Sequence, residues 1–377
     1  MYTKFKINDL TGPAKHFAKP QIVGHYSING VREYCNDLSQ LKYYIKPLDP
    51  DNVYFDLDDN HNTIYKPEND YSKLDNLLRW MSENFDQLKR QDSNNENDRW
   101  LEPEIVCFRG LLKILMITPY HKEDGWIICA SKFKGTIYLC AFDTDKKKQR
   151  ILNEPAHIKQ WSSWGYKFEQ YLLSGKPSTN PDLSVPLNQN EEFCCVFKSK
   201  LRETVLLYGA EIDGICFQQQ IEDILIGKDV ELIELKTVTH RAFNSKGDML
   251  PVKGGYRAPR TLQWWCQCYL VDIKRITCGH RNDDGIVTKI KEYNLRQLAS
   301  DSRGSWSHEI CRNFCDQFLQ KVKTIVTEDY EKCLYKFTYE PRIDSITVHK
   351  IKPDPNFEYT FLHSWYIDKA KRHFENR

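Results

Sequence analysis

The 377-residue chain lacks a long apolar segment, which argues against a protein that spans a membrane. Its longest apolar run, near residues 111–117, is interrupted by Lys113. That run is far shorter than the roughly 20 residues that a helix needs to cross a bilayer. The N-terminal segment MYTKFKINDL contains no apolar signal core. We therefore expect no membrane partner, and residence in the nucleus, the cytoplasm or both.

Several motifs that carry known chemistry are also missing. None of the 13 cysteines forms a CxxC pair, so zinc-knuckle spacing is absent, and the odd count predicts reduced thiols. Neither GxSxG nor GxxxxGK(S/T) occurs, which argues against a serine hydrolase elbow and a phosphate-binding loop. No catalytic role is assigned to the isolated histidines His121, His157, His240, His280 and His308.

The overall charge is nearly balanced, at a formal +2. Nucleic-acid binding would therefore need a local basic groove and not a globally cationic surface. Hydrophobic residues make up 40% of the chain and charged residues 28%, as in an ordinary globular protein. We expect a single domain over residues 1–377, with residues 1–65 packing as a peripheral region of strands and loops.

The hydrophobic pattern predicts a mixed α/β fold, with central mixed β-sheets flanked by helices. Helical periodicity marks residues 74–88, 261–273 and 308–327. Short blocks of β-branched and aromatic residues predict strands at 126–130, 136–142, 192–199, 204–213, 214–217, 230–238, 286–293 and 333–339. The polar stretch QDSNNEND, at residues 91–98, predicts an exposed connection.

Ionisable side chains interrupt two of the predicted buried strands, in the segments YGAEIDG and ELIELKT. Residues two apart on a strand face the same side, so Glu211 should project with Asp213, and Glu234 with Lys236. Burying such groups without a partner is costly. If the two strands are neighbours, all four side chains form one patch.

Carboxylates gathered in one patch repel each other unless a cation or a proton neutralises them. Oxygen ligands suit hard divalent cations, so the patch predicts Mg²⁺ or Mn²⁺. Two ions roughly 4 Å apart can hold the attacking and leaving oxygens of a phosphoryl displacement. Lys236 would then orient the nucleophilic water or offset charge on the phosphate.

An Asp followed at a distance by Glu-x-Lys, here Asp213 and Glu234-Leu235-Lys236, resembles the PD-(D/E)xK nuclease core. The alternative is structural. In that interpretation, Glu234 and Lys236 form a surface ion pair across strands, while Glu211 and Asp213 cap a hairpin.

Three further motifs accompany this core: GYKFE, which ends in Glu169, FRG, which contains Arg109, and RTLQWW, which contains Gln263. The whole ordered series, over about residues 105–280, resembles the decapping exoribonuclease (DXO) family and its nuclear RNA 5′-pyrophosphohydrolase relatives. Each motif is short, but their shared order and spacing are specific.

The resemblance implies metal-binding acids at Glu169, Glu211, Asp213 and Glu234, with the backbone carbonyl of Leu235 as a further ligand. It also implies that Lys236 and Gln263 contact the scissile phosphate and that Arg109 holds a phosphate of the RNA. A structural arginine at the edge of the core is the alternative for Arg109. Some relatives have lost the acids, whereas this sequence retains them, which favours catalysis.

The stretch KGGYRAPR places Lys253, Arg257 and Arg260 just before the predicted helix of Gln263. These residues could line an entry channel and bind RNA phosphates without reading bases, although a solvated loop explains each one nearly as well. Four tryptophans flank the predicted site: Trp161, Trp164, Trp264 and Trp265. They could stack on a cap or a terminal base, but core positions are the favoured interpretation.

The sequence thus predicts a divalent-metal hydrolase of RNA 5′ ends. By resemblance, its substrates would carry a 5′-triphosphate, an incomplete cap or a nicotinamide-dinucleotide cap, and 5′→3′ digestion of monophosphorylated RNA could accompany this activity. A first alternative is a catalytically weak protein that binds RNA ends or stabilises a 5′→3′ exoribonuclease. A second alternative is a DNA nuclease with the same core.

Overall fold

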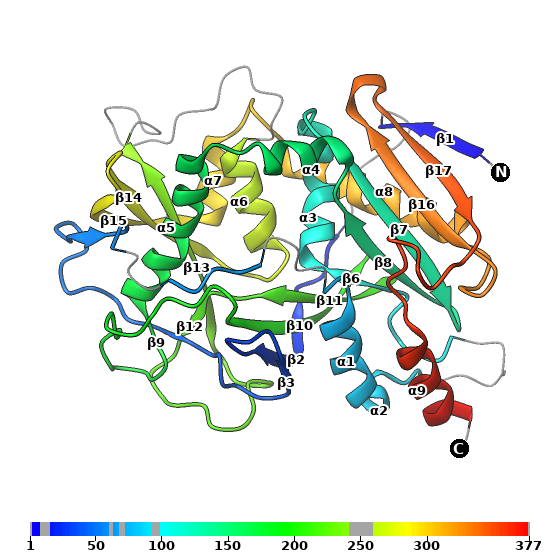
Figure 1. Ribbon diagram of the computed structural model, residues 1–377, viewed down its shortest axis with the longest axis horizontal. Helices are drawn as coiled ribbons and strands as arrows, with labels where there is room; N and C mark the ends of the chain where they lie inside the picture. The colour runs from blue at the N-terminus through cyan, green and yellow to red at the C-terminus, as the bar shows by residue number, and fades with distance from the viewer. Residues whose placement is uncertain are drawn as a thin grey trace.

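The computed structural model describes residues 2–7, 16–59, 63–67, 72–91, 99–240 and 259–375, and it shows a mixed α/β fold (Figure 1). The predicted fold class is confirmed. In these ranges the strands form one large and one smaller sheet, with helices packed against both.

The larger sheet forms the body of the molecule (Figure 1). In spatial order its strands are β1 (Tyr2–Lys6), β17 (Ser345–Ile351), β16 (Leu334–Glu340), β7 (Trp126–Phe133), β8 (Thr136–Phe142), β6 (Ile105–Phe108), β11 (Thr204–Glu211), β10 (Glu192–Leu201), β2 (Gln21–Ile28) and β3 (Tyr34–Cys35). Strand β6 runs parallel to both of its neighbours, and the other pairs are antiparallel.

The smaller sheet is joined to the larger one through the short link between β11 and its own strand β12 (Gly214–Cys216). Its strands are β5 (Phe55–Asp56), β15 (Ile286–Asn294), β14 (Arg275–Arg281), β13 (Glu231–Thr239), β12 (Gly214–Cys216), β4 (Tyr43–Tyr44) and β9 (Leu173–Ser174). Only Ile212 and Asp213 separate β11 of the larger sheet from β12 of the smaller one. The chain therefore crosses between the sheets within two residues.

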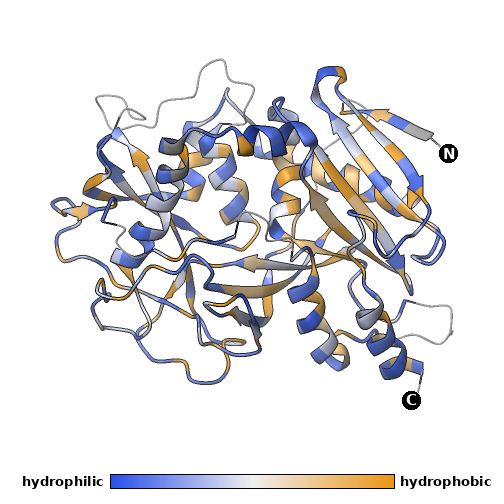
Figure 2. Ribbon diagram, in the orientation of Figure 1, coloured by the Kyte–Doolittle hydropathy of each residue, from blue (hydrophilic) through white to orange (hydrophobic). Residues whose placement is uncertain are grey.

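Helices pack on both faces of each sheet. Their bounds are α1 (Asp75–Glu83), α2 (Phe85–Leu88), α3 (Arg109–Ile117), α4 (Asp145–Leu152), α5 (Ala156–Leu172), α6 (Arg260–Tyr269), α7 (Leu295–Asp301), α8 (His308–Ile325) and α9 (Ser364–Glu375). Helix α3 packs against α6 and α8, α1 packs against α9, and α5 packs against β13. Figure 2 shows apolar residues gathered along the strands of the larger sheet, whereas α4 is mostly hydrophilic.

Alternation along β11 divides the core into layers. Leu206 and Tyr208 pack in a cluster with α3, α6 and α8, while Leu207 packs on the opposite face with α1 and α9. This is the two-residue period of a strand buried on both faces. A third, smaller cluster joins α5 to β13 through Phe168 and Leu235.

The described part of residues 1–65 supplies strands to both sheets. Strand β2 pairs with β10 in the larger sheet, and β4 and β5 belong to the smaller one. Leu41 and Tyr43 are buried in the main core cluster. Leu57 belongs to the cluster around α5.

Several predicted elements differ from the observed ones in their bounds. The predicted helix 74–88 is two helices, because Asn84 interrupts it and its side-chain amide donates to the Trp80 carbonyl. The helix predicted to reach residue 273 ends at Tyr269, ahead of Asp272, whose φ is +60°. Helices α3, α4, α5, α7 and α9 were not predicted. Within the stretch 91–98, residues 92–98 lie outside the described part of the chain.

The structure also bears on the cysteines and on membrane-spanning helices. All 13 cysteines are free in the structure, and 11 of them are buried. Across the described ranges, no helix combines the length and the apolar character needed to cross a bilayer.

Candidate functional site

Four acidic side chains approach one another where the two sheets meet. Glu211 is the last residue of β11, Asp213 lies in the link to β12, Glu234 lies in β13 and Glu169 lies in the last turns of α5. Glu169, Glu211 and Asp213 all line one pocket of about 280 Å³. Glu234 is almost completely buried beside them. The structure thus brings together all four acids that the sequence singled out.

Mutual repulsion perturbs the carboxyl groups. Burial, followed by the charge of Asp213, raises the pKa of Glu169 well above its ordinary value. Burial and the charge of Glu234 raise the pKa of Asp213 to about 7, despite the opposing effect of Lys236. For Glu211, burial and the charge of Glu192 raise the pKa. Glu211 exposes much of its side chain to solvent although protein surrounds it, as expected at the floor of a cleft. The patch therefore carries more negative charge than its surroundings offset.

Lys236 is the cation within this patch. Its ammonium forms an ion pair with Glu234, two residues earlier on the same face of β13. Burial alone would lower the pKa of Lys236, but the charges of Glu234, Asp213 and Glu169 together raise it. Leu235, between them, points its side chain into the core, while its N–H donates to Oδ2 of Asp213 at 2.7 Å. That hydrogen bond ties β13 to the link between the sheets.

Glutamine 267 is a site residue that the sequence reasoning missed. Its Nε2 donates to Oε1 of Glu234 at 2.5 Å, and its Oε1 accepts from Nζ of Lys113 at 3.0 Å. Gln263, predicted to contact the scissile phosphate, lies one turn earlier on α6 and is half-buried. A signal was available, because residues four apart on a helix share a face, so Gln263 and Gln267 project together.

Arg109 holds the framework of the site together. The guanidinium is buried and donates through Nη2 to the carbonyl of Glu211 at 3.0 Å and through Nη1 to the carbonyl of Gln267 at 3.1 Å. It therefore connects the end of β11 to α6. These bonds are those of a structural arginine, the alternative considered for it, and they leave its other N–H groups available to a ligand.

The predicted basic stretch is described only at its end. Arg260 is the first residue of α6. Lys253 and Arg257 lie outside the described residues. Among the tryptophans, Trp164, Trp264 and Trp265 are buried, as the favoured interpretation expected. Trp161 differs from them, because 42% of its surface is exposed.

The pocket extends away from the acids toward a second charged group that was not predicted. Glu192, at the start of β10, accepts from Arg32 at 2.7 Å and from Lys66 at 2.5 Å. Glu192 lines the pocket together with Lys42 and Asn188. Little in the sequence marks this residue, since an acidic residue at the start of a strand is common.

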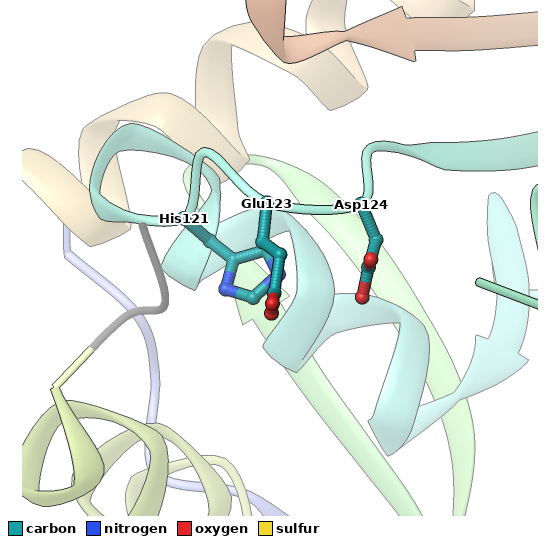
Figure 3. A group of neighbouring side chains, drawn as sticks. All are labelled: His121, Glu123 and Asp124. Carbon is teal, nitrogen blue, oxygen red and sulfur yellow. The ribbon is translucent and has the colours of Figure 1, made fainter. Parts of the chain in front are cut away.

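A tighter group of potential metal ligands lies elsewhere. The ligand atoms of His121, Glu123 and Asp124 lie within 4.8 Å of one another in the turn before β7 (Figure 3). Asp124, however, already accepts hydrogen bonds from Arg150, at 2.9 Å to Nη2 and 3.2 Å to Nε. The acids around Asp213 are spaced more widely than this trio. Unlike the trio, Glu169, Glu211 and Asp213 line the pocket, and burial together with nearby carboxylates raises their pKa values.

Comparison with known proteins identifies the relatives of this chain. The family model described as RAI1-like PD-(D/E)XK nuclease matches residues 18–367. The chain is 32% identical over 367 residues to the human decapping and exoribonuclease protein, covering 95% of this chain and 87% of the relative. It is 27% identical over 365 residues to the decapping and exoribonuclease protein Rai1 of Drosophila melanogaster, covering 95% and 93%.

Solved structures agree with this relationship at the level of the fold. Candida albicans Rai1, crystallised in complex with pU5 and Mn²⁺, has a TM-score of 0.80 at 18% identity, and the match covers 98% of this chain and 100% of that chain. Scheffersomyces stipitis Rai1, in complex with (3′-NADP)⁺ and calcium, has a TM-score of 0.78 at 18% identity, covering 96% and 98%. The family model alone spans most of the sequence, and three of the predicted acids, Glu169, Glu211 and Asp213, line one pocket. The chain belongs to the RAI1-like PD-(D/E)XK nuclease family.

Proposed function

We propose that this protein hydrolyses linkages at the 5′ end of RNA in a reaction that depends on a divalent metal ion. The observation that carries the proposal is a cluster of five charged side chains. Glu169, Glu211 and Asp213 line one pocket, and Glu234 is buried beside them and paired with Lys236. Two relatives support the substrate class. The human relative is named for decapping and exoribonuclease activity, and the Candida albicans structure contains pU5 with Mn²⁺.

The acidic patch fits Mg²⁺ or Mn²⁺, in our proposal as a pair of ions. Its donors are carboxylate oxygens, which hard divalent cations prefer. The raised pKa of Glu169 and of Asp213 marks negative charge that nearby cations do not offset. The ligands would be Glu169, Glu211, Asp213, Glu234 and the carbonyl of Leu235. Such ions supply charge neutralisation at the phosphate and acidify a water molecule.

The remaining polar groups would hold the RNA end. Lys236 places an ammonium next to Glu234, where it can hydrogen-bond to a non-bridging phosphate oxygen or orient the attacking water. Gln263 remains our candidate for a contact with the scissile phosphate, and we add Gln267, which lies on the same helix face and donates to Glu234. Arg109, Lys253, Arg257 and Arg260 remain candidates for contacts with RNA phosphates.

The substrates we propose are RNAs that begin with a triphosphate, an incomplete cap or a nicotinamide-dinucleotide cap, with 5′→3′ digestion of monophosphorylated RNA as an accompanying activity. A 5′→3′ exoribonuclease partner, and residence in the nucleus or cytoplasm, belong to the same proposal of RNA 5′-end quality control. Trp161 adds a surface on which a base of the RNA strand could stack.

The test is a substrate panel. Purified protein is incubated with 5′-triphosphate, unmethylated-cap, nicotinamide-dinucleotide-capped and 5′-monophosphate RNAs in Mg²⁺ or Mn²⁺, beside an E211A/D213A variant. We expect the parent protein to release the 5′ end and the variant to be inactive. A parent protein without turnover on any RNA would favour the non-catalytic alternative. Faster cutting of duplex DNA than of RNA would favour the DNA nuclease.

A further inference from the structure

Lys113 is a cation at the site that belongs to none of the sequence motifs. It lies within the apolar run of α3, four residues after Arg109, so both side chains are on the same face of the helix. Its Nζ donates to Oε1 of Gln267 at 3.0 Å. The same glutamine donates through Nε2 to Glu234 at 2.5 Å. Lys113 therefore reaches the acidic patch through a single side chain.

The chemistry of these three groups decides how the amide is turned. An ammonium can only donate hydrogen bonds, a carboxylate can only accept them, and an amide has one end of each kind. With Lys113 on one side and Glu234 on the other, the Gln267 oxygen must face the lysine and its nitrogen must face the carboxylate. The reverse orientation would set oxygen against carboxylate and NH₂ against ammonium. Both contacts would then be repulsive.

The rest of Gln267 is already fixed. Arg109 holds its backbone carbonyl, which secures this turn of α6 against the end of β11. The side-chain amide is thus the part of the residue whose direction depends on Lys113. A neutral donor fixed beside Glu234 leaves the negative charge of that carboxylate available to a cation.

We propose that Lys113 is a positioning residue that fixes the orientation of the Gln267 amide in the site. The inference rests on the proposed function for its effect on turnover, although the orientation itself is a property of the folded chain. Lys113 does not contact the acids directly. It acts through Gln267, and this dependence separates it from a lysine that merely supports the fold.

The catalytic test is a double-mutant cycle between Lys113 and Gln267 in the full chain. K113M removes the donor and keeps most of the side-chain volume. Because a hydrogen bond to a charged group is strong, we expect its loss to lower kcat by about tenfold. KM should be nearly unchanged. We expect K113R to recover most of this loss. In a Q267M background, K113M should cause no further loss, because its target is gone.

A matched control comes from Lys323 on α8, which pairs with Glu104 away from the acids. K323M should leave kcat unchanged. The proposal is overturned if K113M lowers kcat by the same factor with and without Gln267, if K113M has no effect, or if K323M matches it.

A second readout does not depend on activity. With ¹⁵N-labelled glutamine, the side-chain NH₂ signals of Gln267 are assigned by their disappearance in Q267M. We expect K113M to shift them, K113R to restore them and K323M to leave them unchanged. Unshifted signals in K113M would refute the proposed orientation. A parent protein that turns over no RNA would instead reject the proposed function, and the NH₂ signals would still decide the role of Lys113.

Discussion

At the scale of single residues, the site depends on acids whose charges are not matched by nearby cations. Lys236 pairs with Glu234, but burial and neighbouring carboxylates still raise the pKa values of Glu169 and Asp213. Folding brings these groups together at a cost in stability, which a bound cation would offset. Such an arrangement is typical of a functional site.

Replacing Asp213 with asparagine tests this balance. An amide oxygen can still accept the Leu235 N–H, so the fold should persist. We expect D213N to have a melting temperature equal to or above that of the parent without metal, because one repelling charge is removed. Stabilisation of the parent by Mn²⁺ should be lost in the variant, along with turnover.

Thermal unfolding with and without Mn²⁺ measures both effects. Asn188, which also lines the pocket, provides a variant control, because N188A should keep the Mn²⁺ response. If D213N unfolded at a much lower temperature without metal, Asp213 would have a structural role.

The exposed ring of Trp161 makes a separate prediction about RNA binding. Arg281 lies 5.5 Å from the centre of this ring and 4.4 Å from that of Trp164, so a cation supports the tryptophan pair. Stacking of a base on an aromatic side chain contributes about 1–3 kcal/mol. We expect W161A to weaken binding of single-stranded RNA by about that amount.

Binding is measured with a fluorescent oligonucleotide in a D213N background, which prevents cleavage. Trp365, on α9, is the matched control, since 38% of its surface is exposed. Equal affinity of W161A and the D213N parent, or an equal loss in W365A, would contradict a stacking role.

At the scale of elements, α5 must lie close to the smaller sheet to deliver Glu169. Phe168, beside it, is completely buried against β14, where Gly279 leaves room for its ring. The sequence motif GYKFE pointed to Glu169 but not to its helix, because Ser162, Ser163 and Gly165 weaken the helical signal. Packing against β13 and β14 stabilises a helix that propensity alone does not predict.

Alanine at Gly279 should disturb this contact. Its added Cβ would lie 2.5 Å from a ring carbon of Phe168, which is closer than packed atoms approach. We expect G279A to lower the free energy of unfolding by about 1–3 kcal/mol and to reduce kcat, because Phe168 adjoins Glu169. Urea unfolding and steady-state kinetics measure the two effects.

Gly165, within α5, is the matched control. Its added Cβ would meet no atom within 4 Å, so G165A should leave kcat unchanged and raise the free energy of unfolding by about 0.5–1 kcal/mol. A G279A variant as stable and active as G165A would show that α5 can shift without consequence.

The pair of strands β14 and β15 makes a prediction about pH. Burial, then the charges of His240, Lys291 and Lys289, lower the pKa of His280 to about 4, and its Nε2 lies 2.9 Å from the hydroxyl of Tyr293. The unfolded chain protonates this histidine near pH 6.5, whereas the folded chain does so only near pH 4. The histidine therefore contributes stability that is lost as the pH falls from about 6.5 toward 4.

We expect the free energy of unfolding to fall less between pH 6.5 and pH 4 in H280Q than in the parent protein. The two proteins are compared at each pH, because the site acids with raised pKa values stabilise the folded state as the pH falls. This effect is the same in both proteins, so it cancels in the difference. Parallel stability curves from pH 7 to pH 4 would exclude His280 as a contributor.

At the scale of the whole molecule, the sequence predicted the class of fold and the acids but not how the sheets are joined. Alternation in the two acidic segments was a local signal, and it correctly placed Glu234 with Lys236 on one face. The contact of Lys113 with Gln267, and that of Arg32 with Glu192, join residues more than 150 positions apart. No periodicity reports such contacts, because they depend on the completed fold.

The two sheets should unfold together. The main core cluster contains residues of both, such as Ile105 of β6 and Ile276 of β14. Because this core is shared, we expect unfolding followed by circular dichroism and by tryptophan fluorescence to give coincident transitions. Two separated transitions would instead indicate two independently stable units.

The crossing of the chain at Ile212 and Asp213 has one more consequence. A protein whose two sheets have not yet docked holds Glu211 and Glu234 apart, and so it lacks the charge density that captures a cation. We therefore expect catalytic activity only in the fully folded chain. A partly folded chain would leave nearby RNA intact.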